Sequence, residues 1–134
     1  MSKYKDVVKG AKLTGLGTVR KAVVFDFDGV IHSYTSGWRG ATVIPDPPVP
    51  GIKEAIDQIG EQYDVVVVST RCARYDGLKA VVKYLADHDI RVDRVMSEKP
   101  PALCYIDDRA ICFDGNSEEL LDKINHFKTW REKT

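Results

Sequence analysis

The sequence has no long apolar run and few cysteines. No stretch approaches the roughly 18 consecutive apolar residues that a membrane-spanning helix requires, and the N-terminus lacks the apolar core of a secretion signal. The three cysteines, Cys72, Cys104 and Cys112, show neither a CxxC pattern nor a Cys/His metal spacing, which is typical of reduced thiols. We therefore expect a soluble, cytoplasmic protein without a membrane partner, in which Cys104 and Cys112 are small core residues.

An excess of charge is also absent. The chain has 20 basic and 20 acidic residues, so its overall charge favours neither nucleic acid nor a membrane surface as a partner. The balance is uneven at the start, where residues 1–21 hold six basic residues against Asp6 alone. We expect residues 1–20 to form a solvated basic extension and residues 21–134 to form one domain, because 134 residues with 43% hydrophobic content suffice for a single core.

What the sequence does have is an alternation of apolar runs with helix-like periodicity. Strands are expected at 22–26, 65–68, 91–96 and 103–106, with a short edge strand at 110–113. Helices are expected at 51–60, around 78–85 and from Asn116 onward, the last burying Leu120, Leu121, Ile124, Phe127 and Trp130. This alternation predicts an α/β fold, a Rossmann-like three-layer α/β/α sandwich with a central parallel sheet.

Acidic and hydroxyl side chains follow the expected strands. Asp26 and Asp28 end the first strand, Ser69 follows the second, and Asp107 with Asp108 follow a later one. Ligands of parallel sheets bind at the carboxyl ends of the strands, so these side chains are expected in one crevice. Adjacent carboxylates repel one another and lose solvation, which favours a bound cation. The alternative for Asp26 and Asp28 is a solvated strand end before a glycine turn.

Four motifs in a fixed order carry a family resemblance. They are Asp26-Phe27-Asp28-Gly29-Val30, Ser69 after a valine run, Lys99 before Pro100, and Asp107-Asp108 after Tyr105-Ile106. The set resembles the haloacid dehalogenase superfamily of aspartate-nucleophile phosphohydrolases over about residues 21–113, and the first and fourth motifs are the specific ones. The resemblance implies a Mg²⁺-dependent phosphatase that hydrolyses phosphate monoesters through an aspartyl-phosphate intermediate.

The resemblance also implies a role for each motif residue. Asp26 is expected to be the nucleophile, Asp28 the general acid and then the general base, Ser69 a hydrogen-bond partner of the phosphoryl group, and Lys99 its neutralising cation. Mg²⁺ is expected at four carboxylates, those of Asp26, Asp28, Asp107 and Asp108, and the sequence leaves open which of the last two binds it directly. Taken alone, Ser69 is equally well explained as a helix N-cap, and Lys99 is better explained as a surface lysine before a Pro-Pro turn.

No cap domain is expected in this chain. Substrate choice in the resembled superfamily depends largely on cap domains inserted at two places. The intervals Asp28–Gly51 and Ser69–Lys99 span 23 and 30 positions and cannot hold a folded cap of about 50 residues or more. An open site of this kind serves large or extended substrates, or is completed by a neighbouring subunit.

The loop that follows the catalytic strand is the expected substrate-reading element. Its Trp38 and Tyr34 are candidates to stack on a base, and Arg39 or Arg71 to hold a second phosphate. The alternative for Trp38 is that it pins the loop to the core. His32 lies close to the acids in sequence, but an isolated loop histidine is more often a hydrogen-bonded bystander.

The last motif gives the only hint about the substrate. Ile106-Asp107-Asp108-Arg109 is similar to the corresponding motif of polynucleotide kinase-phosphatases and of deoxyribonucleotidases, which favours nucleotides or nucleic-acid end phosphates. A kinase loop of the form GxxxxGK[S/T] is absent from the sequence. Two alternatives stay open: a phosphatase for small metabolites such as sugar phosphates, completed by oligomerisation, and a non-catalytic binding module on the same fold.

Overall fold

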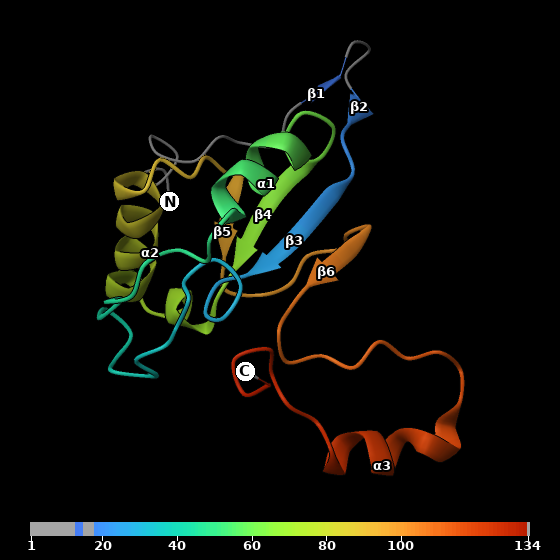
Figure 1. Ribbon diagram of the computed structural model, residues 1–134. Helices are drawn as coiled ribbons and strands as arrows, with labels where there is room; N and C mark the ends of the chain where they lie inside the picture. Colours follow the sequence, from blue (N-terminus) through green and yellow to red (C-terminus); the bar gives the residue numbers. More distant parts are fainter. Residues whose placement is uncertain (1–12, 15–17, 134) are drawn as a thin grey trace.

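The computed structural model describes residues 13–14 and 18–133. Its main sheet has four parallel strands, β3 (Ala22–Asp26), β4 (Asp64–Val68), β5 (Arg94–Met96) and β6 (Cys104–Ile106), in the order β5-β4-β3-β6. The helices are α1 (Ile52–Ile59), α2 (Tyr75–Asp87) and α3 (Leu120–Asn125), and the short 3-10 helices η2 (Thr70–Ala73) and η3 (Ser117–Glu119) precede α2 and α3 (Figure 1). The expected α/β class with a parallel sheet is therefore confirmed.

The start of the described chain forms a separate two-stranded pair. β1 (Leu13–Thr14) and β2 (Thr18–Val19) are antiparallel and do not belong to the main sheet. Residues 1–12 and 15–17, which belong to the predicted basic extension, lie outside the described residues.

β3 lies inside the main sheet, between β4 and β6. Val24 is in register with Val66 on one side and with Tyr105 on the other. The valine run of β4 is buried throughout, which is why it lacks the alternation of a half-exposed strand. Because all four strands are parallel, the residues that follow β3, β4 and β6 emerge at the same edge of the sheet (Figure 1).

One face of the sheet packs against α1 and α2. The main core cluster joins alternate residues of the two central strands to apolar residues of these helices, and it includes Val23, Phe25, Val65, Val67, Ile56, Val81 and Leu85. The opposite face has a smaller cluster made of Ala22, Val24, Val66 and Val68, with Met96 and Ala102 packed against it. Within the described residues, no helix contributes to this second cluster.

The helix after Asn116 is shorter and more exposed than expected. It ends at Asn125, and Leu121, Ile124 and Trp130 are 70%, 58% and 43% exposed. Figure 1 shows α3 standing away from the sheet, beyond the carboxyl ends of the strands. The predicted burial of this apolar stripe is therefore wrong: a helical period identifies an apolar face, but only the path of the chain decides whether that face meets the core.

Three other expectations fail around β6. Cys104 and Cys112 are exposed rather than buried, because β6 is an edge strand and the chain leaves the sheet after it. Residues 110–113 form no strand, and β5 starts at Arg94 rather than at Arg91.

None of the described helices has the length and apolar character to cross a bilayer.

Paired alanine substitutions test this arrangement. We expect Leu85→Ala to lower the free energy of unfolding by about 3 kcal/mol, because it removes a side chain from the main core and leaves a cavity. Leu121→Ala, on the exposed side of α3, should change it by less than about 0.5 kcal/mol. Urea unfolding followed by circular dichroism measures both, and equal losses would contradict the exposed position of α3.

Candidate functional site

Polar residues from three strand ends line one pocket at the carboxyl edge of the sheet. β3 ends at Asp26, Asp107 and Asp108 directly follow β6, and Ser69 directly follows β4. The pocket has a volume of about 180 Å³ and is lined by Asp26, Asp28, Tyr34, Trp38, Ser69, Thr70, Asp108, Arg109 and Arg131. The parallel register of β3 and β6 therefore brings Asp26 and Asp108 to the same edge of the sheet, although they are far apart in sequence.

Three carboxylates form a tight group at this edge. The group consists of one carboxylate oxygen from each of Asp26, Asp107 and Asp108, and these three oxygens lie within 4.8 Å of one another. Burial, followed by repulsion from Asp107, raises the pKa of Asp26 to about 7. The side chain of Asp108 is 2% exposed, and its Oδ1 is buried without a hydrogen-bond partner. Such a set of hard oxygen donors, one of them buried and unsatisfied, fits a divalent cation such as Mg²⁺.

Asp28 does not belong to this group and is held by other partners. Its Oδ2 accepts a hydrogen bond from Arg71 Nε at 2.8 Å, and its Oδ1 accepts from Arg71 Nη2 at 3.1 Å and contacts His32 Nδ1 at 2.8 Å. Burial acts to raise the pKa of Asp28, but the hydrogen bonds from His32 and Arg71 outweigh it and hold the pKa below its usual value. The structure therefore does not bring the Asp28 carboxylate into the group of Asp26, Asp107 and Asp108, although the sequence predicts all four as metal ligands.

His32 is a fully buried partner of Asp28 rather than a loop bystander. Its Nε2 accepts the backbone N–H of Asp46 at 3.1 Å, so the ring proton of the neutral tautomer lies on Nδ1 and is donated to Asp28. The turn that begins at Phe27 places the ring here, since the carbonyl of Phe27 accepts the N–H groups of Val30, Ile31 and His32. Only the spacing of four residues between Asp28 and His32 could have signalled this contact.

Arg71 is buried and its donors are committed to other groups. Besides Asp28, its Nη1 donates to the carbonyls of Gly40, Ala41 and Val43, at 2.8 to 3.2 Å. Its guanidinium also lies 4.6 Å from the ring centroid of Trp38. That Arg71 holds a substrate phosphate stays a prediction; in this structure its guanidinium is bound to Asp28 and to the carbonyls of the loop.

The other predicted residues differ in how close they come to the pocket. Ser69 is buried and lines it, and its Oγ accepts the N–H of Arg71 at 3.1 Å as the N-cap of η2. Lys99 is half exposed, with Nζ 3.5 Å from Asp107 Oδ2. Trp38 is 55% exposed and lines the pocket. Arg39 is exposed and is not among the residues that line it.

Arg131 is the residue that sequence reasoning missed. Its Nη1 donates to Asp108 Oδ2 at 2.7 Å, and its guanidinium lies 5.2 Å from the centroid of the Tyr34 ring. Nothing in the local sequence marks it, because it lies outside every motif and reaches the site only through the path of the chain.

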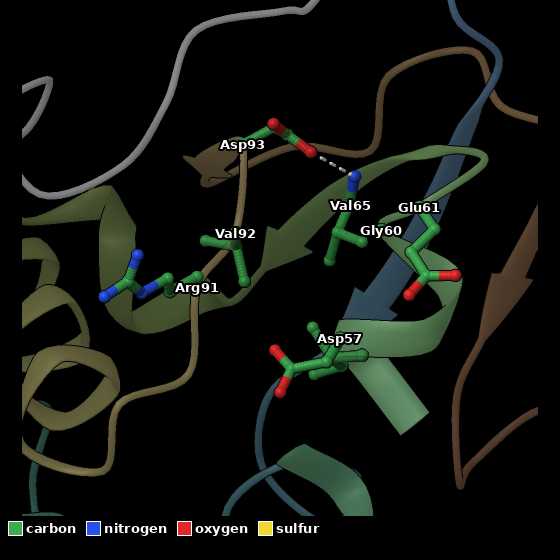
Figure 2. A pocket seen from close by; sticks show the side chains of 8 residues that line it. Asp57, Gly60, Glu61, Val65, Arg91, Val92 and Asp93 are labelled. Atoms are coloured by element: carbon green, nitrogen blue, oxygen red, sulfur yellow. Dashed lines mark hydrogen bonds between the residues drawn. The ribbon is translucent and has the colours of Figure 1, made fainter. Parts of the chain in front are cut away.

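A second pocket lies at the opposite end of the sheet. Figure 2 shows this space of about 150 Å³ beside Val65, whose N–H donates to Asp93 Oδ2 at 2.8 Å. Asp57, Glu61 and Arg91 reach its rim and are exposed. It contains none of the predicted site residues, and the described residues place no metal-ligand group there.

No family model, curated protein or solved structure matches this chain. The residues themselves and their geometry therefore carry the functional assignment.

The pKa of Asp26 gives a pH dependence with a definite sign. The folded value of about 7 lies above the usual 3.8, so the protonated carboxyl stabilises the fold fully below pH 3.8, and this contribution is lost as the pH rises through 7. In chelator, wild type should thus lose stability relative to Asp26→Asn between about pH 4 and 7. Urea unfolding of both proteins across this range measures their free energies of unfolding. If wild type instead gained stability relative to Asp26→Asn as the pH rises, the raised pKa would be contradicted.

The Arg71 contacts predict a large stability effect. Arg71→Met should lower the free energy of unfolding by about 3 to 5 kcal/mol, because it leaves Asp28 without its buried counter-charge. It should also make the loop at 40–43 sensitive to protease. Arg74→Met removes the same charge from an exposed pair with Asp76 and should leave the urea midpoint unchanged. Equal effects of the two changes would be incompatible with a special role for Arg71.

Proposed function

We propose that this chain is a Mg²⁺-dependent phosphatase of the haloacid dehalogenase type, which hydrolyses phosphate monoesters through an aspartyl-phosphate intermediate. The observation that carries this proposal is the group of Asp26, Asp107 and Asp108 at the carboxyl edge of a parallel sheet. Ser69 in the same pocket and Lys99 beside Asp107 support it, because phosphoryl transfer needs a hydrogen-bond partner and a cation at the phosphoryl oxygens.

We extend the proposal to the finer architecture. We propose a Rossmann-like three-layer sandwich without a cap domain that works in the cytoplasm. Its third layer would have to cover the face of Ala22, Val24, Val66 and Val68, to which no described helix contributes. The order β5-β4-β3-β6, with the motif-bearing β3 inside the sheet, supports the Rossmann-like class. The absence of a cap is supported by the interval between Asp28 and α1, since its described residues contain no helix or extended strand.

The metal would be held by Asp26, Asp107 and Asp108. When bound, Mg²⁺ supplies positive charge that neutralises the carboxylates and the phosphoryl oxygens. Asp26 must be ionised to attack phosphorus, and its raised pKa means that positive charge in the pocket favours the reactive form. Lys99 adds such charge next to Asp107.

Asp28 is held ready for one half of its proposed role. The hydrogen bonds from Arg71 and His32 favour its ionised form, which is the form that accepts a proton from the hydrolytic water. The other half, protonation of the leaving alcohol, requires a protonated Asp28. The contact with Arg71 therefore has to loosen at that stage, because a guanidinium cannot stabilise a neutral carboxyl in the same way.

The size of the pocket favours a terminal phosphate. A volume of about 180 Å³ holds a phosphoryl group and little more, whereas pockets that enclose a drug-sized ligand measure roughly 300 Å³ or more. The leaving group then lies outside, near Trp38 and Tyr34, whose rings suit a base. We therefore favour nucleotides or nucleic-acid end phosphates as substrates.

A second candidate is a phosphatase for small metabolites whose site is completed by a neighbouring subunit. The exposed apolar side chains of the C-terminal third favour it, since Phe113, Leu121 and Ile124 are each more than half exposed. Gel filtration distinguishes the two candidates: a stable oligomer favours the metabolite phosphatase, and a monomer favours the open site for larger substrates.

Phosphate release tests the proposed activity. We expect Mg²⁺-dependent release of phosphate from at least one member of a panel of p-nitrophenyl phosphate, mononucleotides, sugar phosphates and a 3′-phosphorylated oligonucleotide. Asp26→Asn should reduce the rate by about 10³-fold or more, because it removes the nucleophile. Asp57→Asn, which makes the same chemical change on exposed α1, is the matched control and should keep full activity. Retained turnover in Asp26→Asn, or none in folded wild type, would refute the proposal.

A further inference from the structure

The chain returns to the acidic group after α3. Residues 129–133, the C-terminal segment, form a turn in which the N–H of Thr129 donates to Glu132 Oε1 at 2.8 Å, and Thr129 is buried. Trp130 Nε1 donates to the carbonyl of Gly29 at 2.7 Å, across 101 positions of sequence. In Figure 1 the red segment that follows α3 lies between α3 and the sheet, on the side of the carboxyl ends.

This docking is built around Asp108. Arg131 Nη1 donates to Asp108 Oδ2 at 2.7 Å, while Asp108 Oδ1 stays buried without a hydrogen-bond partner. Gly29 makes room for the pair: a Cβ there would overlap both Asp108 Oδ2 and Arg131 Nη1, and its φ of +87° also suits only glycine. The backbone of the first motif and the end of the chain thus enclose one carboxylate from two sides.

We propose that Arg131 is the positioning residue of Asp108, so that the C-terminal segment is part of the metal site. This inference rests on the proposed Mg²⁺ site and goes beyond it, because Arg131 belongs to none of the motifs that predict that site. By occupying Oδ2, Arg131 fixes the carboxylate and leaves Oδ1 as the oxygen that a cation can take. A partner of this kind typically changes metal affinity by 10- to 100-fold.

The sign of the effect separates positioning from simple electrostatics. A guanidinium next to a cation site repels the cation, so loss of its charge alone should strengthen metal binding. Loss of a positioning contact should weaken metal binding, because the freed Asp108 carboxylate must then be ordered by the metal itself. The two explanations of the Arg131 contact therefore predict opposite changes.

Linkage adds a second consequence. If the docked C-terminal segment favours metal binding, bound metal must favour docking by the same factor. Mg²⁺ is therefore expected to slow amide hydrogen exchange in residues 129–133. A competing Arg131 would instead be displaced by Mg²⁺, and exchange in this segment would speed up.

Calorimetric titration of the full chain with Mg²⁺ tests the affinity. Arg131→Gln should weaken binding by about 10-fold or more, and Arg131→Lys should restore part of the loss, because one N–H donor at this position suffices for the contact. Trp130→Phe removes the hydrogen bond to Gly29 and keeps an aromatic ring near the Arg131 guanidinium, so it should weaken binding less. Arg74→Gln is the control: it removes the same charge from an exposed pair with Asp76, outside the pocket, and should not weaken binding.

Amide hydrogen exchange, measured with and without Mg²⁺, separates positioning from a merely structural role, because a structural role would give no Mg²⁺-dependent change in the exchange rates of residues 129–133. Slower exchange of residues 129–133 in wild type, absent in Arg131→Gln, supports the inference. Unchanged or tighter Mg²⁺ binding in Arg131→Gln, or faster exchange with Mg²⁺, overturns it and leaves the proposed phosphatase intact. If wild type and Asp26→Asn both fail to bind Mg²⁺, the metal site itself is refuted.

Discussion

Repulsion among carboxylates at one edge of the sheet is the constraint around which the site is arranged. The parallel register of β3 and β6 leaves Asp26, Asp107 and Asp108 with oxygens within 4.8 Å of one another. Such a group is costly unless positive charge reaches it. Lys99 approaches Asp107, and Arg131 pairs with Asp108. The pKa of Asp26 is raised to about 7, first by burial and then by repulsion from Asp107.

The two acids of the first motif differ in pKa because of their surroundings. Asp26 and Asp28 are two positions apart, yet the pKa of the first is raised and that of the second is lowered. Burial acts in the same direction on both, so the difference comes from their neighbours: other carboxylates around Asp26, and Arg71 with His32 around Asp28. Pairs of carboxyls driven apart in this way commonly divide nucleophilic and proton-transfer roles between them, which agrees with the proposed phosphatase.

The central part of the fold and the location of the site could be predicted from local sequence, because apolar runs and strand-end acids are local signals. β3 at Ala22–Asp26 and the cluster of acids at the strand ends are examples. The contacts of Arg71, His32 and Arg131 could not be predicted, since each depends on segments that meet only in the folded chain. The exposure of the apolar stripe of α3 could not be predicted either. Its periodicity identified an apolar face, but the path of the chain left that face exposed.

One guanidinium joins the loop that lines the pocket to Asp28, the proton-transfer acid of the proposed mechanism. Arg71 donates to the carbonyls of Gly40, Ala41 and Val43 and, through its other nitrogens, to Asp28. Since Trp38 also lies against this guanidinium, the loop that lines the pocket and the carboxylate inside it share a single anchor. In the proposed mechanism, a leaving group that displaces the loop also disturbs the Arg71 contact, which has to loosen before Asp28 can carry a proton. Under that proposal, substrate binding at the rim of the pocket would reach the chemistry through this one side chain.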